Sequence, residues 1–469
     1  MRSLITPAST RHLPSRPRLG PLAAAIGLAL ALACAGAAQA QAQSLQVLYD
    51  AARDYDAAYR ATRAQADAVV FKAEQSRALR RPTVNATGTA VMNDANTPYT
   101  STIGTTTQRG AIELSAQQSL FNRANDRTID QAERSIEIAQ AQLLLAEQDL
   151  IIRVTQAYFD VLGAADALTT VQASKKAIIE QLASAKRNFE VGTATITDTR
   201  EAQAKFDLVI AQELAAENDL NIKRLALASV VGRRGASPKP MALPFAVPPL
   251  VPADMEEWVS RADEVSPSLK QLRLSLDIAR LEIEKARAGH LPTVGLSASL
   301  SEAHTRLKGE SRTVAGTSPF PASSGSGLTS NIALQVNLPL FAGWSVQNRI
   351  KETLSLEEKT ASDLEAGRRG VAQNTRAAFL GVQSLAAQVK ALEAAEASNQ
   401  LSLEATQLGY KVGVRVNIDV LNAQAQLFQT QRDLAKARYD VILNRLKLRQ
   451  ASGVLTPQDV YTVEALLLK

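Results

Sequence analysis

The sequence has little of what most enzymes use. Its 469 residues include one cysteine and three histidines, and only 4% of them are aromatic. Only His290 and His304 lie beyond the N-terminal leader, and we find no phosphate-binding loop and no spacing typical of metal ligands. The sequence therefore predicts a protein that is not an enzyme and has no catalytic residues, no cofactor and no metal site. Abundant Ala, Gln and Leu instead indicate long, closely packed helices.

The N-terminus has the features of a secretory signal peptide. Met1–Gly20 carries four arginines and no acidic residue, and Pro21–Gly36 is almost wholly apolar. This apolar run is short for a membrane-spanning helix. Small residues at Ala38 and Ala40 predict cleavage after Ala40, with Ala42 as the alternative site. Residues 1–40 are therefore expected to be a leader, and the remaining chain is expected to be exported.

The single cysteine and most of the basic charge lie in this leader. Cys34 is either removed with it or becomes a lipid-modified N-terminus, although Ala31 stands where such a site would have leucine. Loss of the four leader arginines lowers the formal net charge from +6 to about +2. Without a basic footprint, no nucleic-acid partner is predicted.

The chain contains an internal duplication. "FEVGTATITDTREAQAKF", which begins at Phe189, matches "YKVGVRVNIDVLNAQAQL", which begins at Tyr410, with an offset of 221 residues. "RPTVNATGTA" likewise matches "LPTVGLSASL", and "LSAQQSLFNRAN" matches "LQVNLPLFAGWS", in the same order. These matches predict two structural repeats, residues 41–234 and 255–453, followed by a tail of residues 454–469. Between them, residues 235–254 contain six prolines and are expected to form a surface strap.

Each repeat contains two segments in which apolar and polar residues alternate, as in β-strands with one apolar and one polar face. The apolar positions are Val84, Ala86, Ala90 and Met92; Ile112, Leu114, Ala116 and Leu120; Val294, Leu296, Ala298 and Leu300; and Ile332, Leu334, Val336, Leu338 and Leu340. Each strand is expected to be about ten residues long, which suits a tilted membrane strand. Polar loops are expected at Asn93–Gln108 and Glu302–Leu328. A soluble hairpin is the alternative, but the signal peptide, the four copies and the mostly uncharged polar faces favour a membrane location.

Long helices account for most of the remaining sequence. Ser44–Arg80 and Met255–Gly289 are each expected to be helical, and much longer helices are expected from Asn122 to Asn188 and from Ala342 to Gly409. Apolar residues recur at coiled-coil spacing: Ile129, Ile136, Leu143, Leu150, Ala157, Ala164, Val171, Ile178 and Ala185 in the first long helix, and Val371, Ala378, Val382, Leu385, Val389 and Leu392 in the second. At ~1.5 Å per residue each long helix would span roughly 100 Å, which suits a tube across the periplasm.

Four strands are too few to close a membrane barrel, and open strand edges are not tolerated in lipid. The strands must therefore be pooled between chains, which predicts an obligate oligomer with a water-filled pore lined by Thr, Ser, Asn and Gln.

On these motifs the chain resembles the TolC family of outer-membrane efflux and secretion conduits. The resemblance rests on the corners "VGTATITD" and "VGVRVNIDVL", on strand ends such as "QSLF" and on "ARYDVILNRLKLRQASG", and it extends from Ser44 to about Val463. It implies a mixed α+β membrane protein and a homotrimer, in which four strands per chain build a 12-stranded outer-membrane barrel continuing into a periplasmic helical coiled-coil barrel. It also implies a periplasmic adaptor protein and an inner-membrane ABC or proton-driven transporter as partners, with outer-membrane lipid around the barrel.

The resemblance implies a gate at the two corners, which would be the periplasmic tips of the tube. Arg415 would donate to Asp198 and Thr197, and the Tyr410 hydroxyl would also reach Asp198. Asp419 would contribute to a ring of carboxylates that attracts cations. Asn422 replaces a second acidic residue of the family, which predicts weaker cation capture. A helix-capping role is the alternative for both aspartates.

The resemblance implies two further groups of residues. Val191, Gly192, Val412 and Gly413 match the tips that meet the adaptor, although turn formation alone would also explain them. An aromatic belt at the membrane interface would comprise Phe121, Phe341 and Trp344, with burial where strands give way to helices as the alternative.

The rival hypothesis is a periplasmic coiled-coil adaptor without its own pore. Such a protein would need a lipoyl-like or β-barrel domain between its hairpin arms, and we find no segment for one. The cargo remains open between secreted proteins and small molecules such as drugs. The close match of the tips favours type I secretion.

Overall fold

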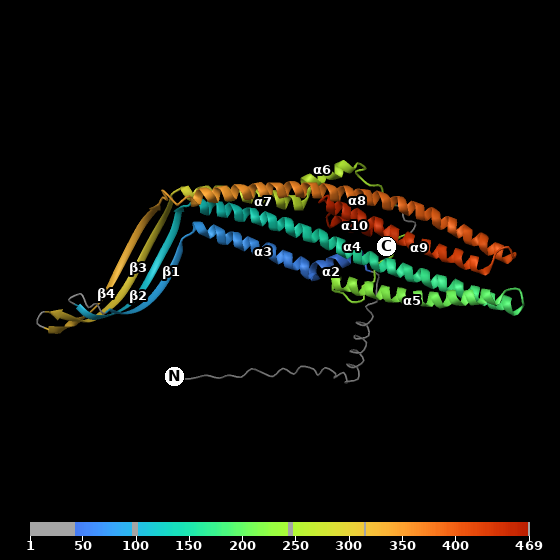
Figure 1. The fold of residues 1–469 in the computed structure, drawn as a ribbon, viewed down its shortest axis with the longest axis horizontal. Coiled ribbons are helices and arrows are strands. Elements are labelled where there is room, and N and C mark those ends of the chain that lie inside the picture. The colour runs from blue at the N-terminus through green and yellow to red at the C-terminus, as the bar shows by residue number, and fades with distance from the viewer. Residues whose placement is uncertain (1–42, 96–101, 243–246, 314–315, 468–469) are drawn as a thin grey trace, which may run out of the picture.

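The computed structural model describes residues 43–95, 102–242, 247–313 and 316–467. The chain forms a long rod with a β-sheet at one end and two helical hairpin tips at the other (Figure 1). The predicted leader, with Cys34 and both cleavage positions, lies outside the described residues.

Two very long helices run through the rod, as their unbroken coiled-coil spacing predicts. α4 spans Arg123–Glu190 and α8 spans Ser345–Lys411. Each turns at a tip into a shorter return helix, α5 (Ile196–Val231) or α9 (Asn417–Ala451). Every residue of the two predicted coiled-coil stripes is buried or partly buried, so these stripes form the contacts between helices.

The two entry segments are not single helices, contrary to expectation. The first is divided into α2 (Leu45–Tyr55) and α3 (Ala57–Arg77), and the second into α6 (Met255–Val265) and α7 (Pro267–Arg287). Asp56 ends the first helix and caps the next by accepting from the Tyr59 amide at 2.8 Å. Ser266 occupies the equivalent position and precedes Pro267, which has no amide hydrogen to continue a helix. A short 3₁₀ turn follows each entry segment, at Ala78–Arg80 and Ala288–His290.

The four strands form one antiparallel sheet in the order β1-β2-β3-β4. They are β1 (Thr83–Ala95), β2 (Thr102–Phe121), β3 (Thr293–Thr313) and β4 (Gly316–Asn337). β2 and β3 come from different repeats, so their pairing joins the two halves of the sheet. Apart from the shorter β1, the strands are about twice the predicted ten residues, and much of the two predicted polar loops continues the ladder. Backbone hydrogen bonds need no apolar side chain, so pairing extends beyond the alternating segments.

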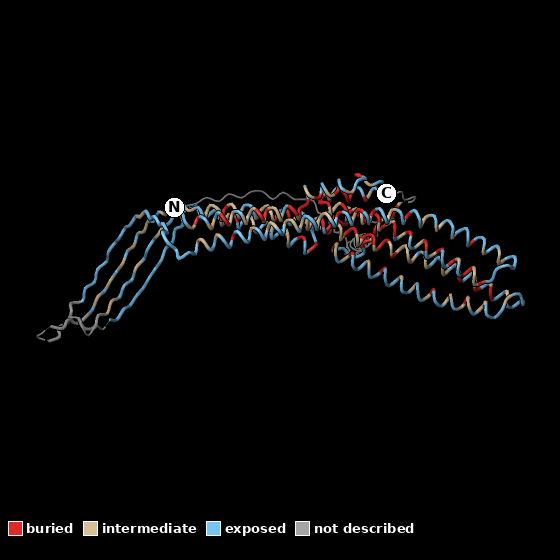
Figure 2. The backbone as a smooth tube through the Cα atoms, turned by 45° about the horizontal axis from the view of Figure 1, so that its top comes forward, coloured by how far each residue is buried: buried red, intermediate tan, exposed pale blue. Residues whose placement is uncertain are grey.

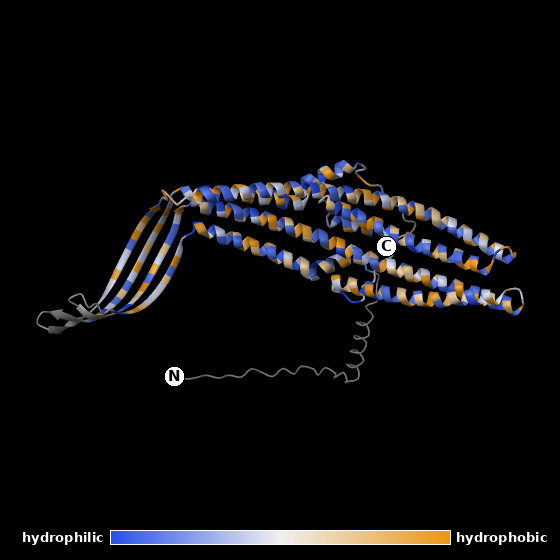
Figure 3. Ribbon diagram, viewed as in Figure 1, coloured by the Kyte–Doolittle hydropathy of each residue, from blue (hydrophilic) through white to orange (hydrophobic). Residues whose placement is uncertain are grey.

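The register places the predicted apolar residues in common rows across the sheet. Val84 pairs with Ala116, Ala116 with Ala298, and Ala298 with Ile332. The adjacent row on the other face is Asn85, Ser115, Ser299 and Asn331. Figure 3 shows this alternation along the strands. In the single chain, every residue of β1 is exposed (Figure 2), so the sheet lacks the core that the helices have.

The main hydrophobic core lies in the middle of the rod, where α2, the strap and the short helix α10 (Gln458–Glu464) pack beside α4 and α9. The strap is anchored there by side chains of both hairpins. The fully buried Tyr158 hydroxyl accepts from the Lys239 amide at 2.8 Å, and Arg445 donates to the carbonyls of Pro248 and Pro249. Backbone hydrogen bonds add to this anchoring, because the Gln43 amide donates to the Ser237 carbonyl at 2.7 Å and the Ala242 amide donates to the Leu466 carbonyl at 3.1 Å.

Among the residues that the structure describes, no helix is both long and apolar enough to cross a membrane.

Candidate functional site: the two hairpin tips

Both tips turn in the same way because each ends its long helix with a glycine. Gly192 has φ +79° and Gly413 has φ +82°, a left-handed conformation that favours glycine. In the first tip the Thr193 amide donates to the Asn188 carbonyl at 2.8 Å, and in the second the Val414 amide donates to the Gly409 carbonyl at 2.9 Å. This is the Schellman end of a helix, and it accounts for the glycine of the repeated corner.

The valines beside these glycines have no packing role within the chain. Val191 is 72% exposed and Val412 is 66% exposed. Val414, which was not predicted, is 77% exposed at the same end of the rod. Turn geometry therefore explains the two glycines but does not explain an apolar side chain in water at each tip.

Asp198 forms a capping box at the start of α5. Its Oδ2 accepts from the backbone amide of Thr195 at 2.9 Å and from the Thr195 hydroxyl at 2.8 Å, and the Thr195 hydroxyl accepts from the Asp198 amide at 3.2 Å. The helix-capping alternative therefore describes one role that Asp198 has. Thr197, one residue earlier, is exposed.

Arg415 and Tyr410 have other partners within one chain than the predicted ones. Arg415 forms an ion pair with Asp419, with 3.7 Å between Nη1 of Arg415 and Oδ2 of Asp419, and the Arg415 side chain is largely exposed. The Tyr410 hydroxyl accepts from the Asn188 side-chain amide at 3.1 Å rather than reaching Asp198. The contacts predicted between Arg415 and Asp198 are thus not formed inside a chain, and they stay a prediction for contacts between chains.

A glycine sets the path of the Arg415 side chain. A Cβ atom at Gly409 would lie 2.8 Å from Cγ of Arg415, which is closer than van der Waals contact allows. Because Gly409 has no side chain, the aliphatic part of the Arg415 side chain can lie against its backbone.

Four polar residues that sequence reasoning missed join the two tips. Asn417, only 1% exposed, accepts from the Gln181 side chain and donates to the Asp198 carbonyl at 3.4 Å. Lys205 donates to Asn422 at 3.3 Å, and Asn188 donates to Tyr410. An apolar cluster below these bonds includes Leu182, Val209 and Leu421, so the two hairpins are packed as well as hydrogen-bonded.

A comparison of the two repeats would have predicted part of this network. At the offset of 221, Asn417 corresponds to Ile196, Tyr410 to Phe189, and Arg415 to Ala194. The second tip is therefore polar at three positions where the first is apolar. Such differences between the two repeats indicate positions where the two copies have different roles.

The aromatic residues predicted for the membrane interface lie where the sheet meets the helices. Phe341 and Trp344 form an edge-to-face pair with centroids 6.2 Å apart, and both are exposed. Phe121, at the end of β2, is also exposed. Within a single chain they are not buried at the junction.

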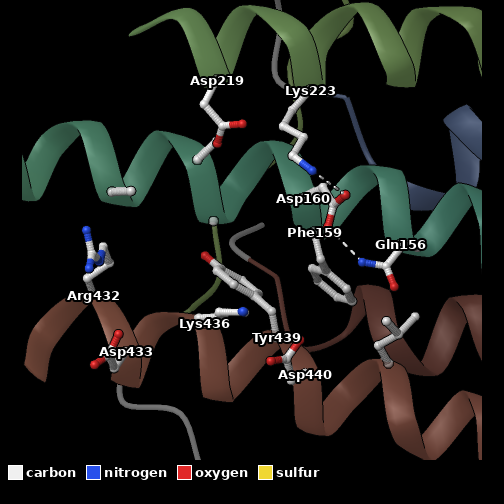
Figure 4. A pocket seen from close by; sticks show the side chains of 14 residues that line it. Gln156, Phe159, Asp160, Asp219, Lys223, Arg432, Asp433, Lys436, Tyr439 and Asp440 are labelled. Carbon is white, nitrogen blue, oxygen red and sulfur yellow. Dashed lines mark hydrogen bonds and ion pairs between the residues drawn. The ribbon is translucent and has the colours of Figure 1, made fainter. Parts of the chain in front are cut away.

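A charged groove of about 690 Å³ lies midway along the helices, between α4, α5 and α9 (Figure 4). Asp160 accepts from Lys223 at 3.2 Å and from Gln156 at 2.7 Å. Gln156 and Asp160 lie on the side of α4 opposite Tyr158, which binds the strap. Burial raises the pKa of Asp440, which also lines the groove. No group of three His, Cys, Asp or Glu residues in the described ranges could hold a metal ion.

Comparisons with known proteins agree with this geometry. The family model described as "Outer membrane efflux protein" matches residues 48–233 and 258–454, and thus both repeats. The outer membrane protein TolC of Vibrio cholerae is 32% identical over 426 residues, which cover 90% of this chain and 93% of the relative. The alkaline protease secretion protein AprF of Pseudomonas aeruginosa is 31% identical over 75% of this chain and 71% of its own.

A solved structure of CusC superposes with a TM-score of 0.74 at 19% identity, covering 88% of this chain and 92% of the other. That structure concerns the folding of CusC and its transmembrane channel formation. At this identity the likeness concerns the fold alone.

Proposed function

Because this chain belongs to the outer membrane efflux protein family, we propose that three copies form one channel, closed at its periplasmic tips by contacts between neighbouring chains. The protein is an outer-membrane channel with a periplasmic helical part, as the sequence predicts. The alternative, an adaptor without its own pore, is not supported, because both repeats match a channel family.

The unpaired edges of the sheet support the trimer. β1 and β4 are the edge strands, and neither edge can remain open in lipid. Pairing β4 of one chain with β1 of the next closes the sheet, and three chains would supply twelve strands. Even strand numbers of eight or more are the rule in bacterial outer-membrane barrels.

The single observation that carries the gate is that Arg415 is largely exposed on one tip while the Asp198 carboxylate, on the other tip, has an oxygen that the capping box does not use. Both hydrogen bonds that the Asp198 carboxylate accepts end on Oδ2, so a donor from another chain could bind Oδ1. An arginine is suited to this because its planar fork makes charge-assisted bonds to carboxylates. Each exposed pair contributes only about 0.2–1 kcal/mol, so three symmetric pairs would hold a closed state that a partner can release.

The exposed valines support contact with a periplasmic adaptor. Val191, Val412 and Val414 place apolar surface at the free ends of the hairpins, and exposed apolar groups rimmed by polar residues are typical of protein interfaces. An inner-membrane ABC or proton-driven transporter would deliver the cargo through that adaptor.

We infer that the cargo includes secreted proteins. AprF, named for secretion of an alkaline protease, shares 31% identity with this chain, nearly as much as TolC of Vibrio cholerae. Deleting the protein and then analysing the culture medium tests this inference. Loss of a protein from the medium that reappears on complementation would support it. An unchanged set of secreted proteins, together with new drug sensitivity, would indicate small-molecule efflux instead.

The gate is tested by single-channel conductance of the purified protein in a planar bilayer. Arg415→Ser and Asp198→Ala should each raise the conductance, because each removes one side of the latch. Arg200→Ser is the matched control. It removes an arginine two residues after Asp198, in the first tip, and should leave the conductance unchanged. Equal conductance in all of these proteins would eliminate the latch and leave Asp198 as a helix cap.

A further inference from the structure

The apolar face of the sheet ends abruptly on β3. Along this strand, Val294, Leu296, Ala298 and Leu300 occupy alternate positions of one face. The register pairs the first three with apolar residues of β4 and Leu300 with Ser330. The next outward positions on the same face are Glu302, His304, Arg306 and Lys308, all four of them exposed. Three consecutive positions of the membrane-facing surface are therefore basic.

The length of the apolar band places these three residues at the membrane surface. From Val336 to Leu328, β4 extends roughly 27 Å along the strand, or about 21 Å across the membrane at a tilt of ~40°. Apolar bands of outer-membrane barrels are ~25 Å tall. Leu328 pairs with Glu302 and His304 pairs with Ser326, so His304 begins where the band ends. This end of the sheet points away from the helices (Figure 1), and thus toward the outer leaflet.

Polar residues of the neighbouring strands surround the basic positions. Arg306 pairs with Gln108 of β2 and with Ser324 of β4. Acidic residues bound the group on this face, and the register places Glu310 at the next position of the same face beyond Lys308. Glu302 precedes the group on β3, and Asp94 lies two strands away from Lys308 through Thr106.

From this placement we propose that His304, Arg306 and Lys308 form a docking site for the phosphate groups of an anionic lipid in the outer leaflet. Arginine binds phosphate through paired N–H donors and lysine binds it as a point charge, and cations at a membrane surface attract anionic headgroups. The apolar side chains directly below would contact the acyl chains of the same lipid. The proposal rests on the membrane location of the sheet and does not depend on the gate or the cargo.

The register provides a matched control. Arg109 pairs with Thr305, between His304 and Arg306, and therefore faces the interior of the barrel. Arg109→Gln removes one positive charge, against two in the Arg306→Gln/Lys308→Gln double variant, at the same height but from the other face. The test compares the full-length protein, the Arg306→Gln/Lys308→Gln double variant and Arg109→Gln after reconstitution in nanodiscs of phosphatidylethanolamine. Native mass spectrometry then measures retention of added lipid A, which carries phosphate groups.

We expect the double variant to retain lipid A about tenfold less well than the wild type, and Arg109→Gln to retain it as well as the wild type. Resistance of the oligomer to dissociation in detergent should be the same in all three proteins, which checks folding. The proposed site would be overturned if the double variant retained lipid A as well as the wild type. It would also be overturned if the double variant and Arg109→Gln lost lipid A to the same extent. Displacement of lipid A by millimolar inorganic phosphate would overturn it too, because acyl contacts are part of the proposal.

Discussion

The side-chain amide of Asn417 donates to the backbone carbonyl of Asp198 across the two tips, which lie 219 residues apart in the chain. Its carbonyl oxygen also accepts from Gln181, so one buried residue at the start of α9 contacts both helices of the first hairpin. The tips of one chain are therefore held together before any second chain is present. Opening that moves one hairpin alone must break these bonds, whereas opening that moves both hairpins as a unit need not.

Replacement of Asn417 by leucine tests which of these motions occurs. Asn417→Leu leaves the Gln181 amide and the Asp198 carbonyl without their partner, at a cost of about 1–3 kcal/mol. If the hairpins separate on opening, the variant should show larger or more frequent conductance steps than the wild type. Asn399→Leu is the control, because Asn399 bonds to Thr430 within the second hairpin. Unchanged gating in Asn417→Leu would indicate that the two hairpins move together.

The Asp56–Arg153 pair predicts a pH-dependent contribution to stability. Arg153 donates to both carboxylate oxygens of Asp56, at 2.8 and 3.1 Å, and these hydrogen bonds lower the pKa of Asp56. A lowered pKa stabilises the folded protein at pH values above the unfolded pKa of about 3.9. This contribution is lost as the pH falls through the lower folded pKa. Asp56→Asn should therefore reduce the free energy of unfolding at pH 7 by about 2 kcal/mol.

The difference between Asp56→Asn and the wild type should shrink below about pH 4, where the Asp56 carboxylate of the unfolded chain begins to be protonated while that of the folded protein is still charged. Thermal unfolding at a series of pH values measures this. Asp149→Asn removes the other carboxylate of the same arginine, but that carboxylate is 60% exposed, and the effect should be under about 1 kcal/mol. Equal losses in the two variants at pH 7 would contradict the prediction.

Two glycines at equivalent positions close the two repeats. Gly232 ends α5 with φ +74° against the Tyr55 ring, and Gly453 follows α9 with φ +75° against Ser266. A Cβ at Gly453 would lie 2.6 Å from Cα of Ser266, which is backbone and cannot rotate away. Gly453→Ala should therefore greatly reduce the amount of folded protein.

Gly235→Ala separates backbone strain from steric conflict. Gly235 has φ +77°, but a Cβ there meets nothing within 4 Å, so the strain alone should cost about 1–3 kcal/mol. Gly232→Ala should fall between the two, because the Tyr55 side chain is half exposed and can move. Yield of folded oligomer and the midpoint of thermal unfolding rank the three variants. If Gly453→Ala were no worse than Gly235→Ala, the close approach to Ser266 would not matter.

Repeats, strands and long helices could be predicted because each has a periodic signal. The strand lengths could not be predicted, because the polar outer parts of β3 and β4 pair through backbone hydrogen bonds, which leave no alternation of apolar and polar residues in the sequence. The breaks at Asp56 and Ser266 were missed because helical segments lie on both sides of each. Asn417 and Gln181 were missed because their bond depends on how two hairpins pack, which no local pattern encodes.

Asn422 provides the last prediction, which concerns cations at the tips. The sequence predicts weaker cation capture where Asn422 replaces an acidic residue, and the structure adds that Lys205 donates to Asn422 at 3.3 Å. Asn422→Asp should therefore increase block of the channel by divalent cations only slightly, because Lys205 would neutralise the new carboxylate.

Combining Asn422→Asp with Lys205→Gln should strengthen the block several-fold beyond Asn422→Asp alone, because the carboxylate then lacks its counter-charge. Lys205→Gln alone is the control and should have a smaller effect, since it adds no acidic group. Conductance measured against increasing Mg²⁺ concentration gives the apparent affinity of each protein. If Asn422→Asp alone blocked as strongly as the double variant, Lys205 would not govern the charge at this position in the assembled channel.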